Sequence, residues 1–341
     1  MSKIKVLVVD DSKLAREMIS AVLSTDSDIE VVGEACDGSE AVKKVRELSP
    51  DIVTMDIEMP VMNGLDAIEN IMADAAVPIL VVTTRGDAQT AYAAISKGAL
   101  DMIQKPDLNP DSANEFIGKI KLLSKIKVIT HIGGKLHRAN ASTDRGEQKL
   151  NFSGSDRVIA IASSTGGPEA LSVVLSALPA SLPCPITVAQ HISDGFVAGM
   201  VEWLKKIIRL KIKVAEEGDI LEAGTVYVSP SEKHMEISSA KRVSLRNRSP
   251  KDIYRPSCDT LLSSAARVYG GKSIGVILTG MGNDGPLGMK MIKDSGGATI
   301  AQDAKTSVVY GMNKVAIDSG CIDSVLPIDS ISAGIINLLS K

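Results

Sequence analysis

Residues 158–168 read Val-Ile-Ala-Ile-Ala-Ser-Ser-Thr-Gly-Gly-Pro, and they constrain the fold of this chain more than any other stretch. The apolar run with its β-branched residues predicts a buried parallel strand, and the Gly-Gly-Pro predicts that a helix follows. A serine at such a corner lies at the carboxyl edge of a sheet, where open α/β folds place their sites. The stretch therefore suits a nucleophilic serine, although Ser163, Ser164 and Thr165 would also suit a plain helix cap.

The first half of the chain repeats the same strand-to-helix pattern five times. Apolar runs at 5–9, 29–34, 52–55, 79–82 and 102–103 are each followed by a segment with helical periodicity. Five strands alternating with five helices predict a doubly wound parallel sheet.

Polar residues follow these strands at the positions where such a sheet exposes its strand ends. Asp10, Asp11 and Asp56 would share one pocket, and three carboxylates repel one another unless a divalent cation joins them. Hard oxygen ligands in a small pocket favour Mg²⁺. Lys105 would offer a positive charge to a phosphate there, and Thr83 would offer a hydroxyl.

This set of residues resembles the receiver domain of two-component response regulators over residues 3–123, and the resemblance implies a flavodoxin-like fold of five strands and five helices. The resemblance implies that Asp56 accepts the phosphoryl group and that Asp10 and Asp11 bind the metal with it. It also implies a switch hydroxyl at Thr83 and a phosphate partner at Lys105, with a cis peptide bond before the proline that follows. Met102 departs from the pattern, because the family usually has Tyr or Phe there, so aromatic rotation is not expected to couple this switch.

The stretch 130–156 is rich in Gly, Ser, Asn, Asp and charged residues and has no apolar period. This composition predicts a linker. We expect a receiver domain over 1–124, a linker over 125–155 and a second α/β domain over 156–341. His131 and His137 fall in the linker without companion ligands, so no metal site is expected there.

In the second half, Ser164, His191 and Asp284 each follow a predicted strand of one mostly parallel, doubly wound sheet. A hydroxyl, an imidazole and a carboxylate at one sheet edge are the groups needed for nucleophile, general base and orienting acid. The order along the chain differs from that of α/β-hydrolases and the GxSxG elbow is missing, which predicts another fold. Short β segments at 212–214, 225–228, 234–237 and 242–245 are expected to form hairpins added to this sheet.

The whole chain resembles the CheB family of chemotaxis response regulators with protein-glutamate methylesterase and glutamine deamidase activity. The motifs that carry the resemblance are Ser-Thr-Gly-Gly at 164–167, Gln-His at 190–191, Lys-His-Met-Glu at 233–236, Arg-Pro-Ser at 255–257 and Thr-Gly-Met-Gly-Asn-Asp-Gly at 279–285. The resemblance implies Ser164 as nucleophile, His191 as base, Asp284 as orienting carboxylate and the backbone N–H of Met281 as oxyanion donor.

Four further residues are candidates for a role beside this triad. Thr165 and Arg255 are candidates for substrate binding, although a structural salt bridge suits Arg255 equally well. His234 matches a family motif without a triad role, which favours packing. Where the family usually has Gly-Ala, this chain has Ala-Ser at 162–163, so Ser163 is a weaker rival nucleophile.

Composition limits the other possibilities. A net charge of −3 gives no reason to expect nucleic acid binding, and no apolar run reaches the roughly 20 residues that cross a bilayer. Four isolated cysteines and an N-terminus that enters a strand directly predict a cytoplasmic protein with reduced thiols and no signal peptide. A monomer without direct membrane insertion is expected.

The expected function is a phosphorylation-activated hydrolase that demethylates, and also deamidates, glutamyl side chains of chemoreceptors. A chemotaxis histidine kinase would be the phosphodonor, Mg²⁺ would serve the receiver alone, and ester hydrolysis would need no cofactor. The receiver is expected to cover the serine edge until Asp56 is phosphorylated. The alternatives are a catalytically silent, phosphorylation-switched scaffold and a transcriptional regulator, although the latter would need a basic recognition helix.

Overall fold

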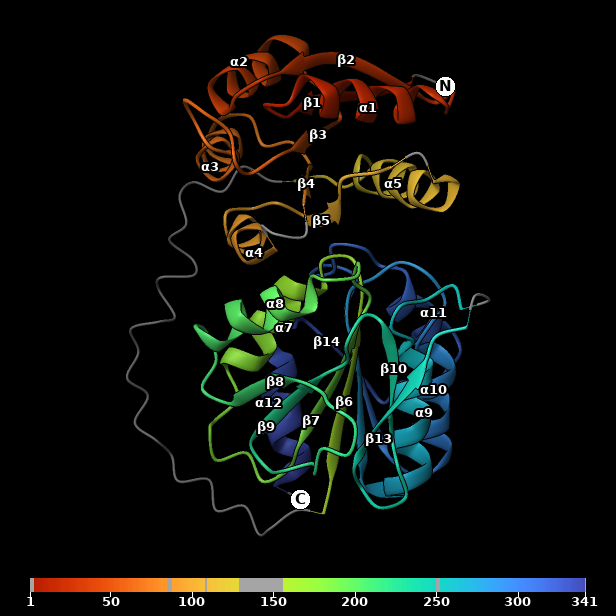
Figure 1. The fold of residues 1–341 in the computed structure, drawn as a ribbon. Coiled ribbons are helices and arrows are strands. Elements are labelled where there is room, and N and C mark those ends of the chain that lie inside the picture. Colours follow the sequence, from red (N-terminus) through yellow and green to blue (C-terminus); the bar gives the residue numbers. More distant parts are fainter. Residues whose placement is uncertain (1–2, 85–87, 108, 129–155, 250–251, 341) are drawn as a thin grey trace. The chain divides into compact units, whose positions relative to one another are not determined.

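The computed structural model describes residues 3–84, 88–107, 109–128, 156–249 and 252–340. The chain divides into an N-terminal and a C-terminal unit (Figure 1). Most of the predicted linker, with His131 and His137, lies outside the described residues. No helix among the described residues is both long enough and apolar enough to span a membrane.

The N-terminal unit is a five-stranded parallel sheet in the order β2-β1-β3-β4-β5, as predicted for a flavodoxin-like fold. Its strands are β1 (Ile4–Val9), β2 (Ile29–Ala35), β3 (Ile52–Met55), β4 (Ile79–Thr83) and β5 (Asp101–Gln104). The helices are α1 (Lys13–Ser24), α2 (Gly38–Leu48), α3 (Gly64–Asp74), α4 (Ala88–Ser96) and α5 (Pro110–Leu123). Figure 1 shows α1 and α5 on one face of the sheet and α2, α3 and α4 on the other.

Burial explains why the strands of this unit are so apolar. All residues of β3 and β4 are buried, because these strands have a neighbour on each side and helices on both faces. Ser12 caps α1 by accepting a hydrogen bond from the backbone N–H of Ala15. Chain direction therefore changes directly after the acidic pair, which leaves both aspartates at the carboxyl edge.

The C-terminal unit is a seven-stranded parallel sheet in the order β14-β13-β12-β6-β7-β9-β8. Its strands are β6 (Val158–Ser163), β7 (Ile186–Gln190), β8 (Lys211–Val214), β9 (Thr225–Val228), β12 (Ser273–Ile277), β13 (Ala298–Gln302) and β14 (Ser324–Leu326). The helices are α7 (Gly167–Ser176), α8 (Val197–Lys205), α9 (Cys258–Tyr269), α10 (Pro286–Asp294), α11 (Met312–Asp318) and α12 (Ile328–Leu339), with a 3₁₀ turn at Gly270–Lys272.

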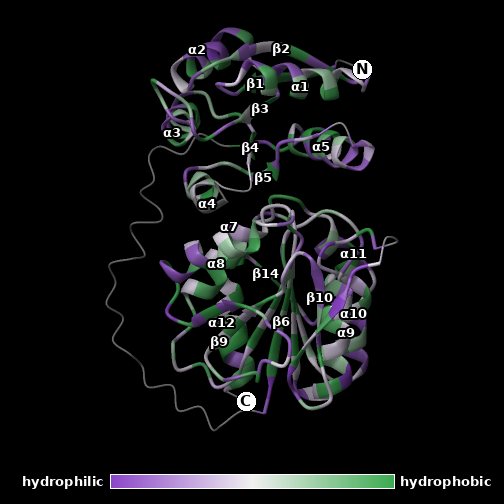
Figure 2. Cartoon of the chain, viewed as in Figure 1, coloured by the Kyte–Doolittle hydropathy of each residue, from purple (hydrophilic) through white to green (hydrophobic). Residues whose placement is uncertain are grey.

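The helices of this unit also cover both faces, with α7, α8 and α12 on one side and α9, α10 and α11 on the other (Figure 1). Figure 2 shows that the central strands are largely hydrophobic. Every residue of β6 is buried between β12 and β7. The strand that carries the serine corner is therefore at the centre of the sheet.

The prediction of added hairpins is right for one pair of segments and wrong for the other. β10 (Lys233–Ile237) and β11 (Val243–Asn247) form a separate antiparallel hairpin. β8 and β9 are instead parallel neighbours at the edge of the main sheet. Short β segments have the same alternating pattern in either arrangement, and the crossover between these two strands contains no helix that would have marked it as parallel.

Candidate active site

The serine corner follows β6 as predicted. Ser164 and Thr165 are nearly buried, and Gly166 adopts a left-handed conformation with φ of 75° before α7 begins at Gly167. A Cβ on Gly167 would lie only 1.9 Å from Gln190 Oε1. The two glycines therefore allow the sharp turn that holds Ser164 at the strand end.

Ser163, the rival nucleophile, is fully buried, and its hydroxyl donates a 2.6 Å hydrogen bond to Gln190 Oε1. The Gln190 side-chain amide in turn donates to the carbonyl oxygens of Ser164 and His191 at 2.8 Å. Ser163 thus joins β6 to β7 through a side-chain network. This role is structural, and it leaves Ser164 as the candidate nucleophile at this corner.

His191 comes directly after β7, the strand beside β6, and its backbone N–H donates to the carbonyl of Ser163 at 3.0 Å. Its imidazole Nε2 lies 2.8 Å from Asp284 Oδ2. Because Nε2 faces the carboxylate, Nδ1 is the ring nitrogen left to accept a proton. The structure brings the predicted base and orienting acid together.

The other contact of the predicted triad, between Ser164 and His191, is not made. Among the described residues, no hydrogen bond joins Ser164 Oγ to the His191 imidazole, although the backbones of the two strand ends are hydrogen-bonded neighbours. Rotation of a serine side chain about one bond moves its hydroxyl, and catalytic hydrogen bonds are often long before substrate binds.

Asp284 is buried at the N-terminus of α9. Its Oδ2 accepts the backbone N–H of Cys258 at 2.5 Å, and its Oδ1 accepts the N–H of Asp259 at 2.9 Å and the hydroxyl of Ser257 at 3.0 Å. Burial alone would raise the pKa of Asp284, but the contact with His191 and the two amides outweigh it and lower this pKa below 3.8. The carboxylate is thus held ionised and oriented toward the imidazole.

A second histidine, His234, holds a residue that positions Asp284. His234 is buried, its Nδ1 accepts the backbone N–H of Ser257 at 2.9 Å, and its Nε2 lies 2.8 Å from Asp252 Oδ2. Packing was the role expected for His234, and the structure shows a more specific one. It fixes Ser257, which is both the N-cap of α9 and a hydrogen-bond donor to Asp284.

Sequence reasoning missed the residues that hold the orienting carboxylate and the imidazole. Ser257 belongs to the Arg-Pro-Ser motif, and a serine before an apolar helical period is a helix-cap signal that could have placed it. Tyr254 stacks on the His191 ring with centroids 5.1 Å apart, and its hydroxyl accepts the N–H of Asn283 at 3.0 Å. No spacing in the sequence predicts that stacking.

Met281 and Arg255 have positions compatible with their expected roles. Met281 is half exposed and follows Gly280, where an added Cβ would lie 2.5 Å from Ser164 Cβ. Its N–H has no hydrogen-bond acceptor among the described residues. Arg255 is exposed and forms no ion pair with a described residue, so the structural salt bridge considered for it is not found.

The acidic pocket of the N-terminal unit has the predicted members. One carboxylate oxygen from each of Asp10, Asp11 and Asp56 lies within 4.8 Å of the others. Lys105 Nζ lies 2.6 Å from Asp10 Oδ2 and 2.7 Å from Asp56 Oδ2. The Thr83 hydroxyl is buried and has no hydrogen-bond partner among the described residues. The oxygen-only ligands in close reach of one another fit Mg²⁺.

Burial and the neighbouring Asp10 raise the pKa of Asp56, although Lys105 opposes this shift. Burial lowers the pKa of Lys105, but its hydrogen bonds to the two carboxylates outweigh that effect and raise the pKa overall.

The expectation of a cis peptide bond between Lys105 and Pro106 is wrong. Within the described residues the cis peptide bond precedes Pro256 instead, so the sequence Lys-Pro did not by itself decide the isomer.

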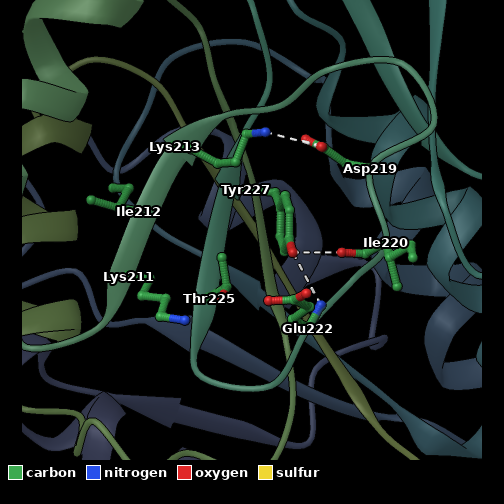
Figure 3. A pocket seen from close by; sticks show the side chains of 8 residues that line it. All are labelled: Lys211, Ile212, Lys213, Asp219, Ile220, Glu222, Thr225 and Tyr227. Atoms are coloured by element: carbon green, nitrogen blue, oxygen red, sulfur yellow. Dashed lines mark hydrogen bonds and ion pairs between the residues drawn. The ribbon is translucent and has the colours of Figure 1, made fainter.

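A pocket of about 350 Å³ in the C-terminal unit lies against β8 and β9 (Figure 3). Several of its polar groups pair with one another. Lys213 contacts Asp219 at 2.9 Å, and the Tyr227 hydroxyl donates to the carbonyl of Ile220 at 2.6 Å and accepts the N–H of Glu222 at 3.1 Å. It contains no residue of the predicted triad, and we assign it no chemistry.

Comparison with known proteins identifies both units. A family model described as CheB methylesterase matches residues 159–335, and one described as response regulator receiver domain matches residues 6–112. A protein-glutamate methylesterase/protein-glutamine glutaminase of Paramagnetospirillum magneticum is 46% identical over 98% of this chain and 96% of its own length. One from Pyrococcus horikoshii is 40% identical over 96% of this chain and 92% of its own.

The crystal structure of the Thermotoga maritima CheB methylesterase catalytic domain is similar to the C-terminal unit. It is 38% identical, with a TM-score of 0.52, and the match covers 54% of this chain and 99% of that domain. With a family match over more than half of the chain and relatives this similar over nearly its full length, the chain belongs to the CheB methylesterase family and carries an N-terminal response regulator receiver domain.

Proposed function

We propose that this protein hydrolyses glutamyl methyl esters, and glutamine side-chain amides, on chemoreceptors during chemotaxis adaptation, with Ser164, His191 and Asp284 as its catalytic residues. The observation that carries the proposal is the 2.8 Å contact between His191 Nε2 and Asp284 Oδ2, on the strand end beside the serine corner. The family relationship and the names of the relatives agree with this chemistry.

In the proposed reaction, Ser164 Oγ attacks the side-chain carbonyl and its proton moves to His191 Nδ1. Asp284 holds the imidazole by Nε2 and stabilises the positive charge that forms on it. The free N–H of Met281 donates to the oxyanion of the tetrahedral intermediate. His191 then gives its proton to the leaving methoxy oxygen, which departs as methanol, or to the leaving amide nitrogen, which departs as ammonia.

Water completes the cycle. His191 accepts a proton from a water molecule that attacks the acyl group on Ser164, and the products are free glutamate and the regenerated serine. Thr165 and Arg255 are proposed to contact the substrate. Arg255 is exposed and free of described ion pairs, which suits a contact with an acidic receptor segment.

The receiver is proposed to control this reaction through Asp56. Asp10, Asp11 and Asp56 would hold Mg²⁺, which when bound supplies positive charge against the carboxylates and the incoming phosphoryl group. Lys105, now paired with two carboxylates, would contact the phosphoryl oxygens, and the unpartnered Thr83 hydroxyl would donate to them. A histidine kinase would be the phosphodonor.

The proposed regulation is that the receiver limits access to Ser164 until Asp56 is phosphorylated. It is supported by the order of the domains and by the linker-like composition of 125–155. We propose that the protein acts in the cytoplasm as a monomer, because the proposed kinase and receptor partners would have to reach it there.

The experiment is a methanol-release assay on methylated receptor, with the full chain, Mg²⁺ and a small-molecule phosphodonor. We expect Ser164→Ala to abolish turnover and Ser163→Ala, the matched control, to retain it with lower stability because one buried hydrogen bond is lost. A wild-type chain without turnover would instead favour the silent scaffold. Turnover that survives in Ser164→Ala would exclude that serine as the nucleophile.

A further inference from the structure

A buried thiol beside the imidazole has no part in the proposed reaction. Cys258 is the first residue of α9 and is fully buried. Its Sγ lies 3.4 Å from His191 Nε2, the same nitrogen that lies 2.8 Å from Asp284 Oδ2. One ligand atom from each of the three residues lies within 4.8 Å of the other two. A sulfur, a nitrogen and an oxygen atom that can bind a metal ion thus lie close together.

The spacing of these atoms is near that of a tetrahedral metal site. With Zn–S near 2.3 Å and Zn–N and Zn–O near 2.0–2.1 Å, a tetrahedral ion holds sulfur and nitrogen about 3.5 Å apart and nitrogen and oxygen about 3.4 Å apart. The sulfur-to-nitrogen distance already fits. The contact between His191 and Asp284 must open by roughly half an ångström, which a small rotation of the imidazole provides.

We propose that Cys258, His191 and Asp284 form an inhibitory site for a borderline divalent metal ion such as Zn²⁺. A thiolate and a carboxylate together neutralise the charge of a divalent ion, which favours its burial. The sulfur ligand selects Zn²⁺ or Co²⁺ over Mg²⁺, so this site differs in kind from the all-oxygen pocket of the receiver. Binding requires the thiol to release its proton to solvent, one proton for each ion bound.

The three proposed ligands differ in their exposure to solvent. The His191 side chain is 13% exposed, whereas Asp284 is 3% exposed and Cys258 is fully buried. Of the three ligands, the imidazole is therefore the one in contact with solvent, and in the proposed site an ion enters from the side of that ring.

Inhibition follows from the protonation of the imidazole, and this consequence rests on the proposed catalytic role of His191. A metal on Nε2 uses the lone pair of that nitrogen, so the single proton of the neutral ring must reside on Nδ1. Nδ1 then has no lone pair for the proton of Ser164. The metal also separates His191 from Asp284, the group that orients it.

A packing role for the thiol would leave the metal unbound. Cys258 Sγ is close enough to donate to the carbonyl of Ala189 at 3.4 Å, which satisfies a buried thiol without any ion. The two interpretations differ in one observable, a metal–sulfur bond.

The test uses the full chain with Co²⁺ as the probe and excess Mg²⁺ to fill the receiver pocket. A Co²⁺–thiolate bond gives a charge-transfer band in the near ultraviolet, which oxygen ligands do not give. We expect the band in the wild type and in Cys36→Ser, which removes the exposed cysteine, and its loss in Cys258→Ser. No band in the wild type, or the same band in Cys258→Ser, overturns the inference.

Because Cys258 is buried, its serine variant has to be checked by circular dichroism. If this variant does not fold, His191→Gln is the test instead. We expect the Co²⁺–thiolate band to weaken or shift when the partly exposed imidazole is removed. An unchanged band would contradict the proposed metal site. In the methanol-release assay, saturating Zn²⁺ should lower the wild-type rate by roughly 100-fold or more, as loss of a general base does, and EDTA should restore it.

The two readouts separate this inference from the proposed function. A wild-type chain that shows the band but no turnover supports the metal site and counts against the proposed catalysis. A chain that turns over, shows no band and keeps its rate in Zn²⁺ supports the catalysis and overturns the metal site. The ratio of rates with and without Zn²⁺ in Cys258→Ser should be close to one, whatever the rate of that variant.

Discussion

His191 Nε2 lies 2.8 Å from Asp284 Oδ2, and this contact determines which nitrogen of the imidazole serves as the base. The carboxylate accepts a hydrogen bond from Nε2–H, and it is itself held by two backbone amides and a hydroxyl at the start of α9. Nδ1 is therefore left with its lone pair. The chemistry proposed for Ser164 depends on that tautomer.

Replacing Asp284 with Asn tests the tautomer. The amide keeps the size of the side chain but lacks the charge and offers a donor where Nε2 needs an acceptor. We expect the hydrolysis rate to fall by about 10⁴-fold, as in other serine hydrolases with this change. Methanol release measures it, and a fall of less than about tenfold would contradict an orienting role for Asp284.

A methyl group at Gly280 tests how closely the loop that carries Gly280 and Met281 must approach Ser164. A Cβ there would lie 2.5 Å from Ser164 Cβ and 2.4 Å from Met312 Sδ, so the loop or the serine must move. We expect Gly280→Ala to lower the rate by roughly 100-fold, because displacement near 1 Å has that effect. The control is Gly118→Ala in α5, where a Cβ meets nothing within 4 Å. Equal rates for the two variants would refute the close approach.

Ser257→Ala separates the capping of α9 from catalysis. The change removes the cap of α9 and one of the donors to Asp284, while the two amide donors remain. We expect the free energy of unfolding to fall by about 1 kcal/mol and the hydrolysis rate to fall as well. The matched control is Asn109→Ala, which removes the cap of α5 in the receiver. If both variants lose stability but neither loses activity, the hydroxyl does not position Asp284.

The acidic pocket predicts a pH-dependent stability of the receiver. The pKa of Asp56 is raised above its ordinary 3.8, mainly by burial, so the folded state holds its proton more tightly than the unfolded chain does. Stability must then fall as the pH rises from 3.8 through the folded pKa, and the loss is complete above it. We expect Asp56→Asn to escape this loss and to be more stable than the wild type at neutral pH without Mg²⁺.

Urea unfolding across that pH range, with and without Mg²⁺, measures the effect. Mg²⁺ should stabilise the wild type more than Asp56→Asn, because the ion binds the carboxylates of the folded state. A wild type that is the more stable of the two at neutral pH without Mg²⁺ would show that Lys105 outweighs the burial of Asp56.

The corners of both sheets could be predicted because their signal is local. An apolar run followed by a polar residue and a helical period places Asp10 and Asp56 at strand ends of the first sheet, and Ser164 and His191 at strand ends of the second. Within each sheet, parallel pairing brings those strand ends to the same edge. The alternation of strands and helices predicted a doubly wound parallel sheet, and the resemblance to receiver domains implied its flavodoxin-like order.

The environment of Asp284 could not be predicted, because it depends on contacts across long stretches of chain. Cys258 and Asp284 are 26 residues apart, and only the packing of α9 brings its N-terminal amides to the carboxylate. His234 reaches Ser257 from a hairpin 23 residues earlier. The parallel pairing of β8 with β9 was missed for a related reason, since strands this short carry no sign of their partner.

The most direct test of the central claim is a double-mutant cycle in kcat/KM between Ser164 and His191. If the two act as one nucleophile and its base, Ser164→Ala and His191→Gln each lower the rate by about 10⁴-fold or more, and the double variant is no slower than the slower single variant. Losses that multiply in the double variant would show that the two residues act independently, and would contradict the account.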